Sequence, residues 1–174
     1  MRRTIPIPRG VVGEGLVAGL IGAVAVAAWF LLVDIIAGRP FFTPAVLGSA
    51  VFFGLRDPTL VTISFQAVLA YTSIHILAFI AVGVTAAGVL KEAEKDRSVL
   101  WLALEFFIMF EFGFHAVVAL VFMPLLAELA WFNVAIGSTI AAGGMGYYFV
   151  PQRVMTRRIL VYSVLLLAAF LVGR

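Results

Sequence analysis

Long stretches without charged residues alternate with short charged clusters along this chain. The uncharged runs cover residues 15–33, 58–90, 129–152 and 159–173, and a further run, 98–127, is interrupted only by Glu105 and Glu111. Because a bilayer core about 30 Å thick needs roughly 20 helical residues, this pattern predicts an all-α, polytopic transmembrane helix bundle. The whole chain, 1–174, is expected to form one transmembrane domain with five spans, at about 11–37, 61–90, 98–123, 129–150 and 156–173.

The last of these spans is the shortest. Its uncharged run, 159–173, rises only about 23 Å as a helix and is bracketed by arginines. The alternative is therefore four spans followed by a C-terminal helix that lies in the membrane interface. The first segment is expected to be a retained span and not a cleaved signal peptide, because its apolar run continues past the small residues at 25–28.

The connection after the first span contains a further short helix, predicted at about 43–54. Thr43 followed by Pro44 is typical of a helix start, with Thr43 as the hydroxyl cap, and Gly54 is a plausible stop. Such a helix is too short to cross a bilayer, so it is expected to be interfacial or re-entrant.

Composition agrees with a membrane protein and excludes several kinds of chemistry. The chain is 64% hydrophobic and 12% charged, whereas soluble domains carry about 25% charged residues. It has no cysteine, which excludes disulfides, thiolate metal sites and cysteine nucleophiles. The G-x-S-x-G, H-E-x-x-H and P-loop patterns do not occur, so an enzyme is not favoured.

The basic residues predict an orientation. With the N-terminus inside, nine of the 12 lysines and arginines fall on the inner side and three on the outer, which agrees with the positive-inside rule. The net charge of +3 therefore needs no nucleic-acid partner, and the C-terminus is expected outside. The outer cations are Arg39, Arg56 and Arg174, and the inner ones are Arg2, Arg3, Arg9, Lys91, Lys95, Arg97, Arg153, Arg157 and Arg158.

Two predicted spans carry faces of small residues, which let helix backbones approach closely inside a membrane. These faces are expected to be internal seams, and a homo-oligomer or partner-subunit interface is the alternative. The packing residues are Gly15, Gly19 and Gly22 in the first span and Gly137 and Gly144 in the fourth.

Polar side chains at mid-membrane depth are the candidate site. Glu111 is placed near the midplane of the third span, with His115 one turn further outward on the same face. Antiparallel packing of the second and third spans would bring His75 level with Glu111, and Tyr71 level with His115. We expect these pairs because an unpaired charge at a helix centre costs about 2.5–3.5 kcal/mol.

Four further polar residues are secondary candidates. Glu105 lies nearer the inner surface and is expected to reach a basic residue there. Asp34 is expected to form an interfacial pair near Arg39 and not to be a buried acid. Glu128 and Asn133 are expected to mark the outer turn between the third and fourth spans.

We call the two predicted pairs, His75–Glu111 and Tyr71–His115, the polar ladder. Three functions are compatible with it. The favoured one is an accessory or assembly subunit of a larger membrane complex, in which the polar pairs fix helix register. A proton-coupled transporter or proton relay through His75, Glu111 and His115 is the first alternative. A haem- or metal-binding protein is the second, with His75 and His115 as haem ligands, although no cofactor is favoured.

The segments "AGRPFFTPAVLGSAVFF" (37–53) and "GGMGYY" (143–148) resemble those of small bacterial multi-pass membrane proteins. The resemblance implies the bacterial cytoplasmic (inner) membrane. The expected partners are the lipid bilayer and either other membrane subunits or further copies of the chain.

Overall fold

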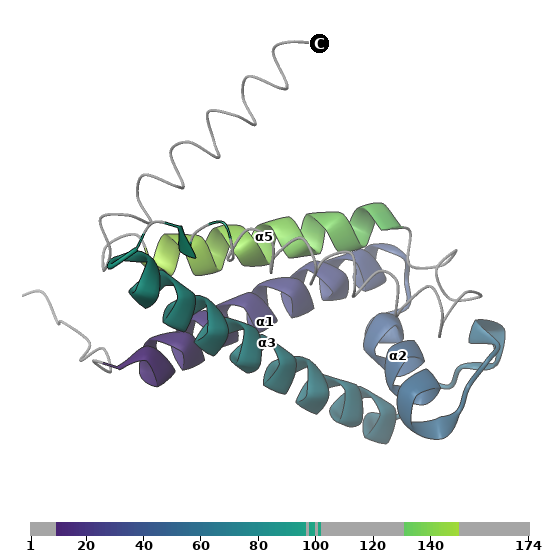
Figure 1. Cartoon of the computed structure of the whole chain (residues 1–174). Coiled ribbons are helices and arrows are strands. Elements are labelled where there is room, and N and C mark those ends of the chain that lie inside the picture. Colours follow the sequence, from purple (N-terminus) through teal and green to yellow (C-terminus); the bar gives the residue numbers. More distant parts are fainter. Residues whose placement is uncertain (1–9, 97, 100, 102–130, 150–174) are drawn as a thin grey trace, which may run out of the picture.

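The computed structural model describes residues 10–96, 98, 99, 101 and 131–149 (Figure 1). Within these residues the protein is helical and has no strand, so the predicted all-α class is confirmed for this part of the chain. Its elements are α1 (Val11–Ile36), α2 (Phe42–Phe53), a 3-10 turn η1 (Pro58–Leu60), α3 (Phe65–Ala93) and α5 (Trp131–Phe149).

Two helices of the described part, α1 and α3, are long and apolar enough to cross a membrane. They have 26 and 29 residues and correspond to the spans predicted at 11–37 and 61–90. Helix α5, with 19 residues, falls where a span was predicted at 129–150, but it is not one of these two apolar helices. The spans predicted at 98–123 and 156–173 lie outside the described residues, apart from 98, 99 and 101.

Helix α1 occupies the centre of the described part. It packs against α3 on one side and α5 on the other, while α2 packs mainly on α3 (Figure 1). Both α3 and α5 run antiparallel to α1, and α3 crosses it at a clear angle in the same view. The C-terminal end of α1, the N-terminal end of α3 and the whole of α2 therefore lie at one end of the bundle.

The helix ends follow from local sequence. Helix α1 ends at Ile36, and two residues later Gly38 has a left-handed backbone (φ 70°), the conformation that glycine adopts readily after a helix. Helix α3 begins at Phe65, directly after the N-cap Ser64, whose hydroxyl accepts a hydrogen bond from the Ala67 N–H at 3.2 Å. Gly54, also left-handed (φ 69°), ends α2 as the sequence predicts.

The start of α2 differs from the prediction. The N-cap is Phe41, held at φ 65°, and not Thr43, which lies inside the first turn. A phenylalanine in this region is unusual, because the left-handed conformation crowds its Cβ. Thr43 does not cap the helix through its own hydroxyl, because both its N–H and its hydroxyl donate to Asp34.

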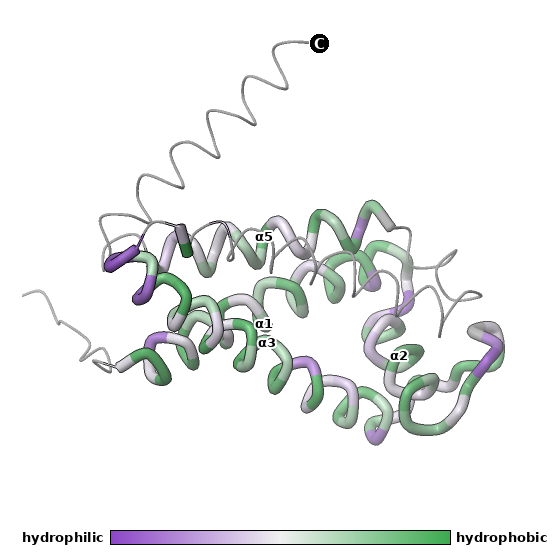
Figure 2. Tube along the Cα trace, in the orientation of Figure 1, coloured by the Kyte–Doolittle hydropathy of each residue, from purple (hydrophilic) through white to green (hydrophobic). Residues whose placement is uncertain are grey.

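The distribution of side-chain sizes is that of a helix bundle with an apolar surround. Buried positions are held by small residues such as Ala18, Ala23 and Ala87, while large apolar side chains such as Leu77 and Val24 point outward. The helices are apolar along most of their lengths, and most hydrophilic positions lie toward the ends of the bundle, although α3 is also hydrophilic near its middle (Figure 2). Close packing through small residues with large ones facing lipid is the arrangement expected inside a membrane.

Candidate functional site

His75 is the polar group of the predicted ladder that the structure describes most fully. Its Nε2 lies 3.2 Å from the carbonyl oxygen of Ala23, so it connects α3 to α1. On α3 its ring stacks on Tyr71, with centroids 5.7 Å apart, and is tilted against Phe79 at 4.8 Å. As predicted from their spacing, Tyr71 and His75 share one face of the helix.

The contact with Ala23 constrains the chemistry of the imidazole. A carbonyl oxygen only accepts hydrogen bonds, and it can take a second one beside its own helical bond. Nε2 must therefore carry the proton that it shares with Ala23. In a neutral ring this leaves Nδ1 as the acceptor, so the side chain joins two helices through one atom and keeps the other for a further partner.

The predicted partners of His75 and Tyr71 on the third span are outside the described residues. Glu111 and His115, together with Glu105 and Glu128, fall within 102–130. The pairs His75–Glu111 and Tyr71–His115 therefore stay predictions, and so does a haem held by His75 and His115. The atom of His75 that contacts α1 is Nε2, one of the two ring nitrogens through which a histidine can bind a metal. Among the described residues, no group of three His, Asp or Glu side chains could hold a metal ion.

Asp34 differs from its prediction in one respect. We expected that it would not be a buried acid, whereas it is only 4% exposed. One carboxylate oxygen accepts from the Thr43 hydroxyl at 2.7 Å and the other from the Thr43 N–H at 2.8 Å. The physical reason is the turn between the helices: Gly38 reverses the chain directly after α1, which brings the start of α2 back over Asp34. A buried carboxylate then satisfies one of the otherwise unpaired N–H groups of α2.

Asn133 lies in the first turn of α5, within the span predicted at 129–150. The outer turn that it was predicted to mark, together with Glu128, lies outside the described residues. The backbone carbonyl oxygen of Asn133 accepts a hydrogen bond from the indole Nε1 of Trp29 on α1, at 2.9 Å. This contact ties the start of α5 to the C-terminal third of α1.

The small residues of α1 bring its backbone against that of α3. A Cβ added at Gly15 would overlap the backbone of Val84, and one at Gly19 would overlap the carbonyl of Phe79. From the other side, a Cβ at Gly83 would overlap the carbonyl oxygen of Gly15. We call this contact the α1–α3 seam. No side chain separates the two backbones there.

The contact between α1 and α5 is formed by side chains. A Cβ at Gly144 would lie 3.2 Å from the Ile21 side chain, and one at Gly137 would lie 3.3 Å from the ring of Trp29. Gly22 lies between both neighbours of α1, since a Cβ there would be 2.7 Å from Met145 on α5 and from Phe79 on α3. We call the contact with α5 the α1–α5 seam.

Two close contacts were missed by the sequence reasoning. Gly83 is half of the α1–α3 seam, and Gly48 of α2 has no room for a Cβ beside the Ala67 carbonyl of α3. For Gly83 a signal was present, because Ala87 follows four residues later and makes a small-residue face on α3. For Gly48 no such spacing stood out.

The two ends of the described bundle carry matching polar turns. At one end the hydroxyl and the N–H of Thr59 donate to Asp57, which holds the pKa of that carboxyl below its usual value. At the other end the N–H and the side chain of Ser98 do the same for Asp96 and lower its pKa. Both carboxylates are fully exposed, and each accepts its hydrogen bonds within a short turn of the chain.

Comparison of the chain with protein-family models, with curated proteins and with solved structures found no match.

Proposed function

We propose that this protein is a multi-pass membrane protein that acts by contact, as an accessory or assembly subunit of a larger membrane complex. The hydrogen bond between His75 and the Ala23 carbonyl carries the proposal. It engages the described histidine at mid-helix depth with a backbone group of the neighbouring helix. Interhelical hydrogen bonds of this kind hold membrane helices in register.

The other polar groups within the helices support the same conclusion. Asp34 joins α1 to α2 through Thr43, and Trp29 joins α1 to α5. Four helical hydroxyl groups donate to carbonyl oxygens one turn earlier in their own helices, which satisfies these four groups without a second helix. These are Thr72 to Val68, Ser73 to Leu69, Thr85 to Ala81 and Thr139 to Ala135.

The topology in this proposal is five spans in a bacterial cytoplasmic membrane, with the N-terminus inside. It is supported by the two apolar helices and by the inner excess of lysine and arginine. The chain has no cysteine, so single-cysteine variants give clean labels. In intact spheroplasts a membrane-impermeant maleimide should label Arg56→Cys but not Lys95→Cys, and the reverse pattern would invert the topology.

The subunit role is tested by isolating the tagged chain from its own membrane at native expression level in a mild detergent. We expect one other membrane protein at fixed stoichiometry, giving a particle well above the 18.8 kDa of the chain. The visible absorption spectrum of the same sample tests for haem. A particle that contains this chain alone in repeated preparations would contradict the subunit role.

A matched variant separates structural use of His75 from proton transfer. His75→Phe keeps an aromatic ring beside Tyr71 and Phe79 but loses the hydrogen bond to Ala23. We expect this variant to lower the free energy of unfolding by about 0.6 kcal/mol. In proteoliposomes, the proton flux of both the wild-type protein and the variant should equal that of protein-free vesicles. Flux in the wild-type protein that Glu111→Ala and His75→Phe both abolish would overturn the proposal in favour of a relay.

A further inference from the structure

Helix α2 is held at the level where α1 and α3 end. Asp34, which binds Thr43 of α2, lies two residues before the end of α1. Gly48, in the middle of α2, lies against the backbone of Ala67, which is two residues after the start of α3. Because α1 and α3 are long and apolar enough to cross a membrane, α2 lies near one membrane surface in the proposed topology.

A short helix at this level has two possible surroundings. An interfacial helix lies on the membrane surface, with a polar face toward water and an apolar face toward the acyl chains. A helix that is apolar on all sides is instead surrounded by protein or by hydrocarbon. The side chains and the backbone of α2 distinguish these two arrangements.

The polar residues of α2 do not form a face. The helix, FTPAVLGSAVFF, has no charged residue, and its two hydroxyl side chains are those of Thr43 and Ser49. Thr43 is buried, with its hydroxyl donating to Asp34 at 2.7 Å, and Ser49 is half-buried. Helix α2 therefore lacks the polar face of an interfacial helix.

The last turn of α2 exposes apolar side chains in several directions. Val51 and Phe52 are each 48% exposed, and Phe53 is 63% exposed. With 3.6 residues per turn, three successive side chains span about 200° of the helix circumference. An apolar surface that extends so far around a helix is unfavourable in water and stable among acyl chains.

The first turn of α2 leaves no backbone N–H for water. The first N–H groups of a helix have no partner within the helix and need another acceptor. Here the N–H of Phe42 donates to the Arg39 carbonyl at 3.0 Å, and that of Thr43 to the Asp34 carboxylate at 2.8 Å. The third residue, Pro44, has no N–H. Pairing with protein atoms meets the requirement that hydrocarbon imposes on backbone polar groups.

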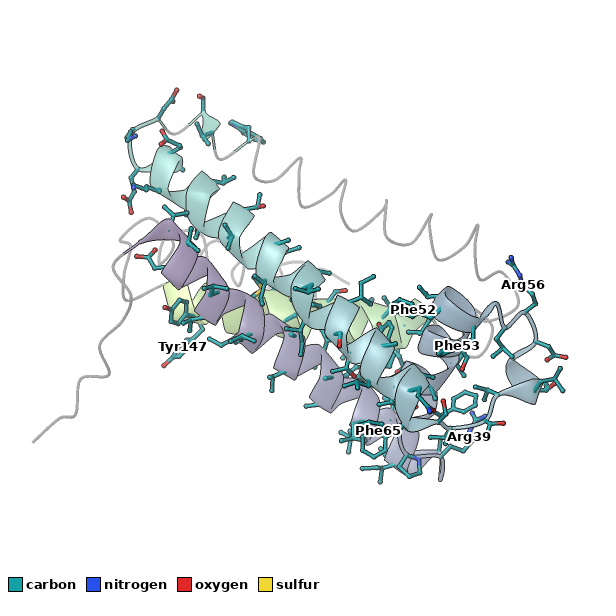
Figure 3. The ribbon with its side chains drawn as sticks, turned by 90° about the horizontal axis from the view of Figure 1, so that it is seen from below. Arg39, Phe52, Phe53, Arg56, Phe65 and Tyr147 are labelled. Atoms are coloured by element: carbon teal, nitrogen blue, oxygen red, sulfur yellow. The ribbon has the colours of Figure 1, made fainter. Side chains whose placement is uncertain are left out.

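Charged side chains flank α2 but do not lie within it. Arg39 precedes the helix, and Arg56 follows three residues after Phe53. In Figure 3 the Arg56 side chain lies farther from the body of the bundle than Phe52 and Phe53. Arginine side chains are long enough to reach the headgroups from an apolar position, so both flanks are compatible with a helix below the headgroups.

We propose that α2 is immersed in the acyl-chain region of the bilayer, with Val51, Phe52 and Phe53 in contact with lipid chains, and does not lie on the membrane surface. Lipid is favoured over a second protein because it surrounds a helix from several directions, whereas a protein partner covers one side. The proposal rests on the membrane placement in the proposed function and is independent of the subunit role.

The test is the accessibility of spin labels on single-cysteine variants of the full chain in vesicles of phosphatidylethanolamine and phosphatidylglycerol. Molecular oxygen concentrates among acyl chains, whereas a hydrophilic nickel chelate stays in water. Labels at Val51→Cys, Phe52→Cys and Phe53→Cys should all collide more often with oxygen than with the chelate. On a surface helix at least one of these three directions faces water, and there the preference would be reversed.

Control positions set the scale of this measurement. Val24 on α1 and Leu77 on α3 are 66% and 64% exposed near the middles of the two candidate spans, so labels there should favour oxygen. A label at the exposed Arg56 should favour the nickel chelate. The circular dichroism of all variants should match that of the wild type, because each replaced side chain is exposed.

Two outcomes would overturn the proposal while Val24 and Leu77 still favour oxygen. A preference for nickel at any of the three α2 labels would place α2 on the surface. Exclusion of both reagents from any of them would show that a protein covers α2. A preference for nickel at Val24 and Leu77 would be a different failure, because it would contradict the membrane placement on which the proposed function depends.

Discussion

The two seams of α1 use the same kind of residue for different purposes. In the α1–α3 seam, Gly15 and Gly83 let two backbones touch, and the nearest atoms that border them belong to the backbone, which cannot move aside. In the α1–α5 seam, Gly144 and Gly137 lie near the side chains of Ile21 and Trp29, which are able to shift by a few tenths of an ångström. A glycine in a small-residue face can therefore have either of two roles. It can be required for the two helix backbones to touch, or it can occupy a position where alanine would also fit.

This difference has a consequence for stability. Lipid tails are as apolar as the helices, so association depends on how closely the backbones approach. Separating α1 from α3 by one methyl group would weaken van der Waals contact along the whole seam, and it would also lengthen the bond between His75 and Ala23. In the α1–α5 seam the indole of Trp29 donates a hydrogen bond to the backbone carbonyl of Asn133. A hydrogen bond from a side chain adjusts to a small separation of the helices more easily than a backbone contact does.

The largest effect is expected for Gly83→Ala, which inserts a Cβ into the backbone of α1. Overpacking of a close contact costs about 1–3 kcal/mol and sometimes more, so the free energy of unfolding should fall by at least that range. The measurement is unfolding in mixed micelles with increasing SDS, followed by circular dichroism.

Gly143→Ala on α5 is the control, because a Cβ there would have no neighbour within 4 Å among the described residues. It should leave stability unchanged or raise it, since alanine is the better helix former by about 1 kcal/mol. If Gly83→Ala were as stable as Gly143→Ala, the α1–α3 seam would not be a backbone contact.

A smaller effect is expected for Thr43→Val, which tests whether the hydrogen-bonded contact between α1 and α2 is as important as a seam. The variant keeps the shape of the side chain but removes the hydroxyl that donates to the buried Asp34 carboxylate. Leaving one lone pair of a buried carboxylate without its donor should cost about 1–3 kcal/mol.

Thr43→Ser retains the hydroxyl and should behave like the wild type in the same unfolding experiment. Equal stability of Thr43→Val and Thr43→Ser would mean that the N–H of Thr43 alone holds Asp34.

The smallest effect is expected for Gly144→Ala. Its Cβ would lie 3.2 Å from the Cγ2 of Ile21, a contact that a slight shift of the side chain relieves. The change in unfolding free energy should be below about 1 kcal/mol and of either sign, because the gain in helix propensity offsets the crowding. A loss as large as that of Gly83→Ala would show that both seams are equally rigid and would remove the distinction.

The sequence predicted some features of the candidate site and not others, for reasons that individual residues show. The shared face of Tyr71 and His75 followed from helical spacing. The partner of His75 on α1 did not, because a carbonyl oxygen is present at every residue and no pattern marks the one that will be used. Asp34 was misplaced for a related reason: its burial depends on how far the turn at Gly38 reverses the chain.

By itself the sequence determined the helical class of the described part, the extent of α1 to within one residue, the approximate position of α3, and the end of α2 at Gly54. These features follow from properties that add up along the chain, namely the length of apolar runs and the backbone preferences of single residues. Only the tertiary structure decided that α1 lies between α3 and α5, and which of its glycines contact backbone. A small residue permits close approach but does not specify the neighbour, which depends on shape complementarity between segments distant in the sequence.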